Sequence, residues 1–334
     1  MQKKSDILIA GAGIIGLSLA LELHSRGAQV TVLERDTALA QASTAAAGML
    51  AANDPHNPLA LEPLSRLSIH LYSGFLEKIA ALSGIAVPYQ TSVTHQYVAD
   101  GSITRLAEHS LDPRQLAVAL LAAVRATDID LREHTELKFT EEWPSGVAAH
   151  CTSGDRISVH QLVYATGSWT STDRLRRLSL PVSPRKGQML RVLLPDNLNL
   201  REVHRAEDIY IVPRLYGPHA GSALIGATVE DAGFDTTVQS TDLANLRHRA
   251  SRLIPTLASE TDAPTLESWA GLRPATPDNL PILGRIEHSE EFLATGHFRN
   301  GILLAPATAV VLADLIQNRT PSVDLQPFTP TRFL

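Results

Sequence analysis

Cysteine is almost absent from this sequence: Cys151 is the only one in 334 residues. A lone thiol excludes an internal disulfide and a cysteine-based metal cluster, and it favours a reducing compartment such as the cytoplasm. The thirteen histidines include no HExxH motif and no other spacing that places two imidazoles on one helix face. We therefore expect a cytoplasmic protein without a metal site.

An excess of positive charge is also missing. The 29 Lys and Arg residues are outnumbered by 35 Asp and Glu residues, which gives a formal net charge of -6. Nucleic-acid-binding domains usually carry a basic surplus, so the composition argues against a nucleic-acid partner. The one basic run, at 173–191, is more typical of a solvated surface and turn than of a phosphate-binding patch.

No apolar run predicts a membrane span. Residues 7–23 follow Lys3 and Lys4, as in a signal peptide, but their glycine spacing indicates a nucleotide-binding turn instead. The run Ile302–Ile316 is shorter than the roughly 20 residues that a spanning helix needs, and a proline and an aspartate interrupt it. At 334 residues the chain is long enough for two domains, or for one large domain with a subdomain.

Residues 6–34 have the pattern of a βαβ unit. An apolar strand leads into the turn Gly11, Gly13 and Gly16, an apolar helix follows, and a second strand ends at Glu34. Such a turn binds a pyrophosphate at the helix N-terminus, and an acidic side chain about 20 residues further on accepts hydrogen bonds from a ribose. With all these parts in place, the sequence favours a dinucleotide site over a plain strand-to-helix turn.

Cofactor-type patterns recur at both ends of the chain, with strand patterns between them. The small residues at 42–50 and the strand 161–170, which ends in Thr-Gly, suit close approach to a flat ligand. Residues 182–270 are mostly strand-like, with one helix at about 240–253, and predict an antiparallel substrate sheet. The expected cofactor domain is discontinuous (1–84, 107–180 and 271–334), and the expected substrate domain comprises 85–106 and 181–270.

The stretch 296–309, GHFRNGILLAPATA, joins a polar loop to an apolar helix. Proline is favoured in the first turn of a helix, so Pro306 predicts a helix from Ala307 to Gln317. The loop before it carries His297, Arg299 and Asn300. Because a helix N-terminus offers unpaired N–H groups and partial positive charge, this loop is expected to meet an anionic ligand.

Eight blocks together resemble the FAD-dependent amine oxidases of the D-amino-acid oxidase superfamily. They are GAGIIGLSLALEL, AAAGML, VYATGSW, YIVPR, GATVEDAGFD, WAGLRPATPD, LPILG and GHFRNGILLAPATA. The match is closest to the glycine oxidase branch, which is associated with thiamine thiazole synthesis. The resemblance implies an α/β fold with a Rossmann-type FAD-binding domain and an antiparallel-sheet substrate domain. It also implies that the C-terminal helix points its N-terminus at the flavin, where negative charge develops on reduction.

The resemblance assigns the cofactor residues by position. Glu34 and Arg35 would hold the adenosine ribose, Leu137 would meet the adenine, and residues 297–303 would surround the flavin ring. The whole set is Gly11, Gly13, Ile14, Ile15, Gly16, Glu34, Arg35, Ala42, Ser43, Ala47, Gly48, Met49, Leu137, Thr166, Gly167, Trp169, His297, Phe298, Arg299, Asn300, Gly301, Ile302 and Leu303. Non-covalent FAD is expected, because Cys151 falls in a predicted hairpin away from these motifs.

For the substrate, the resemblance implies three catalytic residues. Arg273 would clamp a carboxylate with two parallel hydrogen bonds, although its residue type alone equally suits a buried ion pair with Asp278. Tyr210 would place its hydroxyl in the pocket, although a lone strand tyrosine is often a core residue. Arg299 would pair near the flavin or substrate, with a surface role as the alternative. Met49, Tyr210 and Val229 would form the substrate walls.

The implied reaction is oxidation of the C–N bond of glycine, sarcosine or a small D-amino acid. Molecular oxygen is the acceptor, and the products are a 2-oxo acid, ammonia and hydrogen peroxide. No side-chain base is needed if the amine binds unprotonated. Two alternatives stay open: a dehydrogenase of the same fold that passes electrons to a quinone or a partner protein, and a flavin-binding subunit without turnover.

One departure from the family pattern concerns the substrate entrance. Family members usually carry a longer excursion than the short connection seen near 101–110, and the shortening is expected to open the entrance or to alter subunit contacts in a homo-oligomer.

Overall fold

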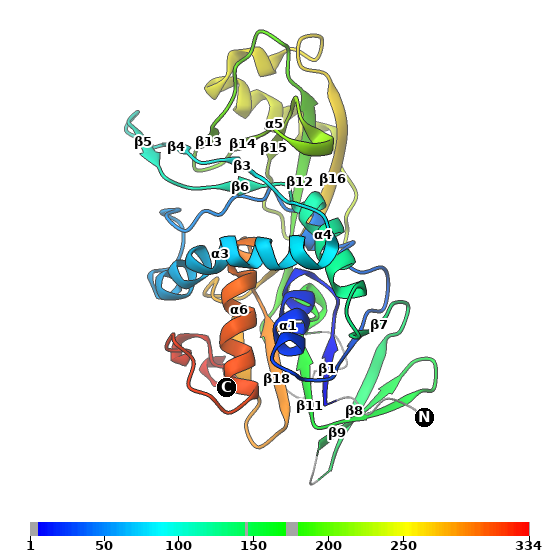
Figure 1. The fold of residues 1–334 in the computed structure, drawn as a ribbon. Helices are drawn as coiled ribbons and strands as arrows, with labels where there is room; N and C mark the ends of the chain where they lie inside the picture. Colours follow the sequence, from blue (N-terminus) through cyan, green and yellow to red (C-terminus); the bar gives the residue numbers. More distant parts are fainter. Residues whose placement is uncertain (1–5, 144–145, 172–179, 334) are drawn as a thin grey trace.

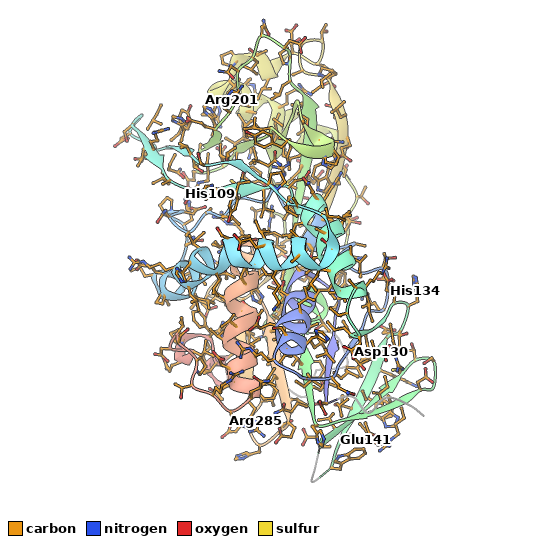
Figure 2. All side chains as sticks on the ribbon, viewed as in Figure 1. His109, Asp130, His134, Glu141, Arg201 and Arg285 are labelled. Atoms are coloured by element: carbon orange, nitrogen blue, oxygen red, sulfur yellow. The ribbon has the colours of Figure 1, made fainter. Side chains whose placement is uncertain are left out.

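A computed structural model describes residues 6–143, 146–171 and 180–333. Two sheets lie at opposite ends of the molecule, and helix α3 (Glu62–Ser83) runs across the region between them (Figure 1). Arg201 marks the end built on the larger sheet, and Glu141 and Arg285 mark the opposite end (Figure 2). The described part of the chain contains no helix that is long and apolar enough to cross a bilayer. Lys3 and Lys4, like residues 173–179 of the basic run, lie outside the described residues.

The cofactor-type motifs converge on a six-stranded sheet of order β17-β18-β11-β1-β2-β7. Its strands are parallel except β17 at one edge, which pairs antiparallel with β18. Residues on β1 alternate between two apolar layers: Ile7 and Ile9 face the helices, and Leu8 and Ala10 face a three-stranded sheet. The strands are β1 (Ile7–Ala10), β2 (Val30–Leu33), β7 (Asp130–Arg132), β11 (Gln161–Tyr164), β17 (Ile282–Arg285) and β18 (Glu291–Thr295).

Helices cover one face of this sheet and a small antiparallel sheet covers the other. The helices are α1 (Ile14–Ser25), α3 (Glu62–Ser83), α4 (Pro113–Arg125) and α6 (Gly301–Ile316). The small sheet has the order β10-β9-β8, with β8 (Leu137–Trp143), β9 (Gly146–Cys151) and β10 (Arg156–Val159). Strands buried on both faces explain why the sequence of the parallel sheet is continuously apolar.

The turn between β1 and α1 has the conformation expected of a nucleotide-binding unit. Gly11 has φ +108°, and a Cβ on it would overlap the Ala165 carbonyl. Gly16 packs against the Gly11 backbone just as closely, so a side chain there would push helix and strand apart. The helix ends before Gly27 at φ +89°, a left-handed position that favours glycine.

The second sheet has seven strands in the order β16-β12-β15-β14-β13-β4-β5. It is antiparallel as expected, with one exception: β13 pairs parallel with β4, because the β4–β5 hairpin joins this edge from a distant part of the chain. The strands are β4 (Thr94–Tyr97), β5 (Ile103–Leu106), β12 (Ser183–Leu193), β13 (Val203–Arg205), β14 (Tyr210–Arg214), β15 (Ser222–Gly226) and β16 (Thr265–Ala275).

Alternation along these strands gives the sheet two different faces. Leu190, Val192 and Ile211 pack with α5 (Ser240–Leu253), whereas Met189 and Val212 belong to a separate cluster beside the cofactor motifs. The remaining elements are short. They are the strand pair β3 (Tyr89–Thr91) and β6 (Ser110–Leu111), α2 (Ala42–Ala45), and the 3-10 turns η1 (Leu59–Leu61), η2 (Gly167–Trp169), η4 (Gly217–His219), η5 (Pro255–Ala258), η6 (Gln326–Phe328) and η7 (Pro330–Phe333).

Two expectations from the sequence are wrong. The C-terminal helix does not begin at Ala307: α6 starts at Gly301 and Pro306 lies inside it. The proline is tolerated because α3 supplies the missing donor, and the Tyr72 hydroxyl donates to the Ile302 carbonyl at 2.8 Å. The described half of the basic run is also not a solvated surface, since it forms β12 and buries Lys186.

The predicted domain boundaries stay a prediction. The strand β16 runs through the expected boundary at 270/271 and pairs with β12 over its whole length. It therefore carries residues of the predicted substrate domain and of the predicted cofactor domain on one continuous strand.

Candidate active site

A cavity of about 820 Å³ lies where the two sheets meet. It is lined by the glycine turn, the end of β2, residues 39–49, η2, β16 and the loop before α6. Every residue predicted to bind cofactor or substrate lines it except Gly16 and Leu303. Those two lie in the packing layer behind it: Gly16 against Gly11, and Leu303 in the core with its carbonyl bonded to Ser68.

At the nucleotide end, two side chains organise the backbone around the N-terminus of α1. The Glu34 carboxylate accepts hydrogen bonds from the N–H groups of Ala12 at 2.9 Å and Asp36 at 3.0 Å. The Ser43 hydroxyl accepts from the Ile14 N–H at 2.9 Å. Each carboxylate oxygen accepts more than one hydrogen bond, so Glu34 retains the capacity to bind ribose hydroxyls.

Stacked side chains also border the nucleotide end of the cavity. The Arg35 guanidinium lies 4.1 Å above the Trp169 ring, which stacks on Phe234 at 5.5 Å. Leu137 lines the same end, and it pairs with Cys151 across β8 and β9. The predicted hairpin is therefore present, and its strand pairing brings Cys151 beside Leu137. The thiol itself is buried outside the cavity lining, and burial raises its pKa, which makes it a poor nucleophile.

The loop before α6 is rigidly bonded. Phe298 has a left-handed φ of +47°, and its N–H donates to the Pro274 carbonyl at 2.8 Å. His297 is buried, and its Nε2 lies 3.1 Å from the Thr308 hydroxyl. Burial lowers the pKa of His297 to about 3, so the imidazole is neutral at physiological pH. Asn300 is the N-cap residue of α6, but its side chain donates to the Asn57 side chain at 3.0 Å and does not cap the helix. The helix N-terminus is therefore open to the cavity through Gly301 and Ile302.

Arg273 presents a cation to the cavity from β16. Its Nη1 donates to the carbonyl oxygens of Thr228 at 3.1 Å and Lys186 at 3.4 Å, and none of the described carboxylates lies at ion-pair distance from it. Asp278, the alternative partner, pairs instead with Arg332 at 2.8 Å. Burial lowers the pKa of the Arg273 guanidinium and raises the pKa of the neighbouring Tyr210 hydroxyl.

This arrangement fits a dinucleotide at one end and a small carboxylate at the other. The N-termini of α1 and α6 both open onto the cavity, and in the glycine turn Gly11 and Gly16 pack too closely against the backbone to carry side chains. A family model described as "FAD dependent oxidoreductase" matches residues 6–110 and 98–315.

This chain belongs to the FAD-dependent oxidoreductase family. Its cofactor is FAD, which the residues at the nucleotide end and at the α6 end of the cavity would hold. FAD is a two-electron carrier, so the family assignment makes the cavity a redox site.

Several relatives of this FAD-dependent oxidoreductase are similar over the whole chain. The glycine oxidase of Geobacillus kaustophilus is 32% identical over 100% of this chain and 98% of its own length. The crystal structure of a glycine oxidase from the same organism matches with a TM-score of 0.90 at 30% identity, covering 99% of each chain. The "Bifunctional protein ThiO/ThiG" of Trichormus variabilis is 36% identical over 98% of this chain. The chain spans about half the length of that relative, 55%.

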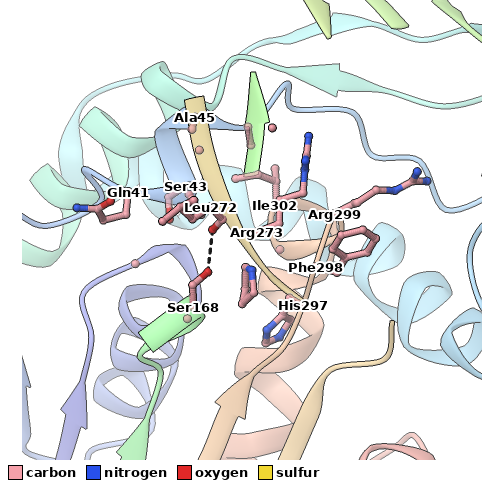
Figure 3. Close-up of a pocket in the computed structure, with 18 of the residues that line it drawn as sticks. Gln41, Ser43, Ala45, Ser168, Leu272, Arg273, His297, Phe298, Arg299 and Ile302 are labelled. Carbon is pink, nitrogen blue, oxygen red and sulfur yellow. Dashed lines mark hydrogen bonds between the residues drawn. The ribbon is translucent and has the colours of Figure 1, made fainter. Parts of the chain in front are cut away.

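The remaining predicted residue, Arg299, lies at the rim of the FAD-dependent enzyme's cavity. Its guanidinium forms an ion pair with Asp54 at 2.8 Å and is about one-third exposed, at 34%. Figure 3 shows Gln41 and Ser43 on one side of the strand that carries Leu272 and Arg273, and Phe298 and Arg299 on the other. Arg299 therefore combines the two roles left open by the sequence: it lines the cavity and it is paired near the surface.

The sequence analysis missed three residues that line the cavity, namely Gly187, Gly271 and Asp54. The two glycines matter because of strand register. Gly187 lies opposite Gly271 in the β12–β16 pair, and a Cβ on Gly187 would overlap the Arg273 guanidinium. A Cβ on Gly271 would approach the Ala45 side chain at 2.5 Å. Asp54 is the third missed residue, since nothing in its local pattern indicates a pairing with Arg299. The sequence does hold one indication of Gly187, its position inside the strand-like stretch RKGQM, because a glycine inside a strand often marks a close approach of another group.

Proposed function

We propose that this protein oxidises the C–N bond of glycine and other small amino acids, with oxygen as electron acceptor. The products are a 2-oxo acid, hydrogen peroxide and ammonia, with methylamine in place of ammonia when sarcosine is the substrate. For glycine, the balanced reaction consumes one oxygen and one water. The observation that carries the proposal is the half-buried Arg273 guanidinium, which faces the cavity without a carboxylate partner among the described residues.

A half-buried cation with no carboxylate partner among the described residues favours an anionic ligand. Arg273 can bind a carboxylate through two parallel hydrogen bonds, which fixes the position of the adjacent α-carbon. The Tyr210 hydroxyl interacts with the same guanidinium and lines the same part of the cavity. Together they support the binding of an α-amino acid by its carboxylate.

The proposed cofactor contacts follow from the lining residues. Glu34 and Ser43 would hold the ribose and pyrophosphate side, and the α6 N-terminus would stabilise negative charge on the ring side. FAD, when bound, supplies a two-electron acceptor for the α-carbon. The neutral His297 is buried and bonded to Thr308, so it does not add a competing positive charge to the α6 end.

Substrate size is set by the walls beside Arg273. Met49, Tyr210 and Val229 line the space into which a side chain on the α-carbon would project. A small pocket rejects a bulky side chain by steric overlap, whereas a missing methylene costs only about 1–3 kcal/mol. We therefore propose the order glycine, then sarcosine and D-alanine, then D-phenylalanine in kcat/KM. The relatives named as glycine oxidases support the place of glycine at the head of this order.

The proposal is tested on the purified protein. FAD should be present at about one per chain, and acid precipitation should release it into the supernatant. Under anaerobic conditions glycine should bleach the flavin, and air should restore its colour with release of hydrogen peroxide. Bleaching without peroxide but with rapid dye reduction would identify a dehydrogenase, and an unbleached flavin would identify a binding subunit. A clear preference for D-phenylalanine would overturn the proposed substrate and leave amine oxidation intact.

A further inference from the structure

A buried lysine lies directly behind the candidate carboxylate site. Lys186 on β12 is only 2% exposed, which is rare for an ammonium group because removal from water is costly. Its Nζ lies 3.3 Å from the Glu230 carboxylate and 4.0 Å from that of Asp235. The backbones of Lys186 and Glu230 also exchange two hydrogen bonds of 3.0 Å, so the two residues are held side by side.

Glu230 is bound on both of its oxygens. One oxygen faces Lys186, and the other accepts hydrogen bonds from Gln188 at 2.9 Å and from the Thr228 hydroxyl. Burial alone would raise the pKa of this carboxyl, but the hydrogen bonds from Thr228, Gln188 and Lys186 hold its pKa below the usual value. Glu230 is therefore a fixed negative charge in the wall of the cavity.

The same residues hold Arg273. The two carbonyl oxygens that accept from Arg273 Nη1 belong to Lys186 and Thr228, both of which bind Glu230. Glu230 attracts the Arg273 guanidinium electrostatically without forming an ion pair with it. A Glu230 side chain released from Lys186 would be a ready intramolecular partner for Arg273, because arginine and carboxylate form strong paired hydrogen bonds.

We propose that Lys186 sequesters the Glu230 carboxylate in an ion pair of its own, and so keeps Arg273 free to bind the carboxylate of the substrate. Lys186 is thus a positioning residue, which acts on the substrate through Glu230 and Arg273. The inference rests on the proposed function in one respect, namely that Arg273 binds a carboxylate.

The test measures carboxylate binding without turnover. Acetate is glycine without its amine, and its binding to the FAD-loaded protein is followed through the flavin absorbance spectrum. In Lys186→Met the apparent Kd for acetate should rise about tenfold, within the range typical of coupled sites. In the double variant Lys186→Met/Glu230→Gln, the Kd should return to within about twofold of the Glu230→Gln value, because the competing charge is gone.

A matched control is available on the outer helices. Lys78 pairs with Glu22 at 3.2 Å far from the cavity lining, so Lys78→Met should leave acetate binding unchanged. Thermal unfolding and FAD content are measured for each variant. If Lys186→Met does not fold, Glu230→Gln alone decides: acetate should bind it at least as tightly as it binds the wild type, and a Kd raised about tenfold would contradict the proposal.

The outcomes separate this inference from the proposed function. A wild type that binds acetate but does not oxidise glycine overturns the function and leaves the inference standing. Unchanged acetate binding in Lys186→Met, or a double variant as weak as Lys186→Met, overturns the inference alone. A wild type that binds no acetate overturns the role of Arg273 and the inference with it.

Discussion

At the scale of single residues, Arg273 is the charge on which the proposed substrate binding depends. Its burial lowers the pKa of the guanidinium, so the protein holds an incompletely compensated cation at the cavity wall. Such a group is expected to gain more from a bound carboxylate than an exposed arginine would, because water does not screen the interaction. A lysine at this position would keep the charge but lose the paired hydrogen bonds.

The first prediction is that Arg273→Lys raises the KM for glycine and leaves FAD bound. The substitution should lower kcat/KM by about 1.5–3 kcal/mol, because the paired hydrogen bonds to the carboxylate are lost while the charge is kept. Steady-state kinetics and the flavin spectrum measure the two effects separately. Arg285→Lys, at an exposed site, is the control, and equal kinetics in both variants would assign Arg273 to structure alone.

The lowered pKa of His297 predicts how the free energy of unfolding depends on pH. The pKa of this histidine is about 3 in the folded protein and about 6.5 in the unfolded chain. Between these values the unfolded state binds the proton and the folded state does not. The contribution of this histidine to the free energy of unfolding is therefore fully present above about pH 6.5 and is lost as the pH falls. The slope from this one group approaches about 1.4 kcal/mol per pH unit between pH 6 and pH 4.

The second prediction is therefore that His297→Asn flattens the acid side of the stability profile. Urea unfolding at several pH values gives the free energy of unfolding for the variant and the wild type. His288→Asn, at a side chain that is 91% exposed, serves as the control and should leave the profile unchanged. A wild-type slope that persists in His297→Asn would show that another group titrates.

At the scale of elements, α6 depends on α3. Pro306 cannot donate to the Ile302 carbonyl, and the Tyr72 hydroxyl donates to it instead. One residue further along, the Ser68 hydroxyl donates to the Leu303 carbonyl at 2.6 Å and accepts from the Ala307 N–H at 3.3 Å. Two side chains of α3 thus replace the backbone hydrogen bonds that the proline disturbs, next to the helix turn that opens onto the cavity.

The third prediction concerns this replacement. Tyr72→Phe leaves the buried Ile302 carbonyl without its donor and should lower the free energy of unfolding by about 1–3 kcal/mol. Pro306→Ala introduces an N–H that can bond to the same carbonyl, so the double variant should regain most of the loss. Chemical unfolding of the four proteins measures the coupling. Tyr216→Phe, at an exposed ring, is the control, and no rescue by Pro306→Ala would contradict the interpretation.

The β12–β16 pair controls the position of Arg273 through Gly187. A Cβ at this position would overlap the guanidinium, which is the far end of a flexible side chain and can move. The fourth prediction is that Gly187→Ala raises the KM for glycine at least about tenfold, because the displaced fork no longer aligns with the substrate. Thermal unfolding and FAD content should stay near wild type.

The control for this prediction is a glycine with free space. Gly74 lies in α3 with nothing within 4 Å of an added Cβ. Gly74→Ala should leave the kinetics unchanged and stabilise the helix by about 0.5–1 kcal/mol. A Gly187→Ala variant with normal KM would show that Arg273 reaches the substrate from a different position.

At the scale of the whole molecule, the FAD cavity lies between the two sheets. Its lining comes from β1 and β2 on one side and from β12, β14 and β16 on the other. A ligand along this cavity therefore contacts both sheets and stabilises their arrangement. Binding to the folded state alone adds about 2.7 kcal/mol of stability at a ligand concentration of 100 Kd.

The fifth prediction is that removal of FAD lowers the thermal midpoint and that added FAD restores it. ADP occupies only the nucleotide end, so it should restore less of the midpoint than FAD does. Thermal unfolding of the apoprotein with either ligand measures the difference. Equal effects of ADP and FAD would mean that the flavin end contributes little to the contact between the sheets.

Local patterns predicted much of this architecture. The start of α4 is an example of local control, because Asp112 caps the helix by accepting from the Arg114 N–H and Pro113 suits the first helical position. The glycine turn and Glu34 predicted the nucleotide end, since both follow from backbone geometry within one βαβ unit. Outside that unit the patterns indicated only regions of ligand contact, at 42–50, 161–170 and the loop before α6. The family resemblance supplied Arg273 and the individual roles, because spacing alone does not bring Arg273 and His297 together.

The sequence by itself determined the elements whose causes lie within a few residues: alternation, helix caps, and glycines with a required φ. The tertiary structure alone decided which distant groups meet. Only the packing of α3 on α6 explains a helix that continues through Pro306, and only the pairing with Glu230 explains a buried Lys186. The physical reason is that a backbone defect or a buried charge is acceptable only where another part of the chain supplies its partner, and strand register and helix packing set that partner.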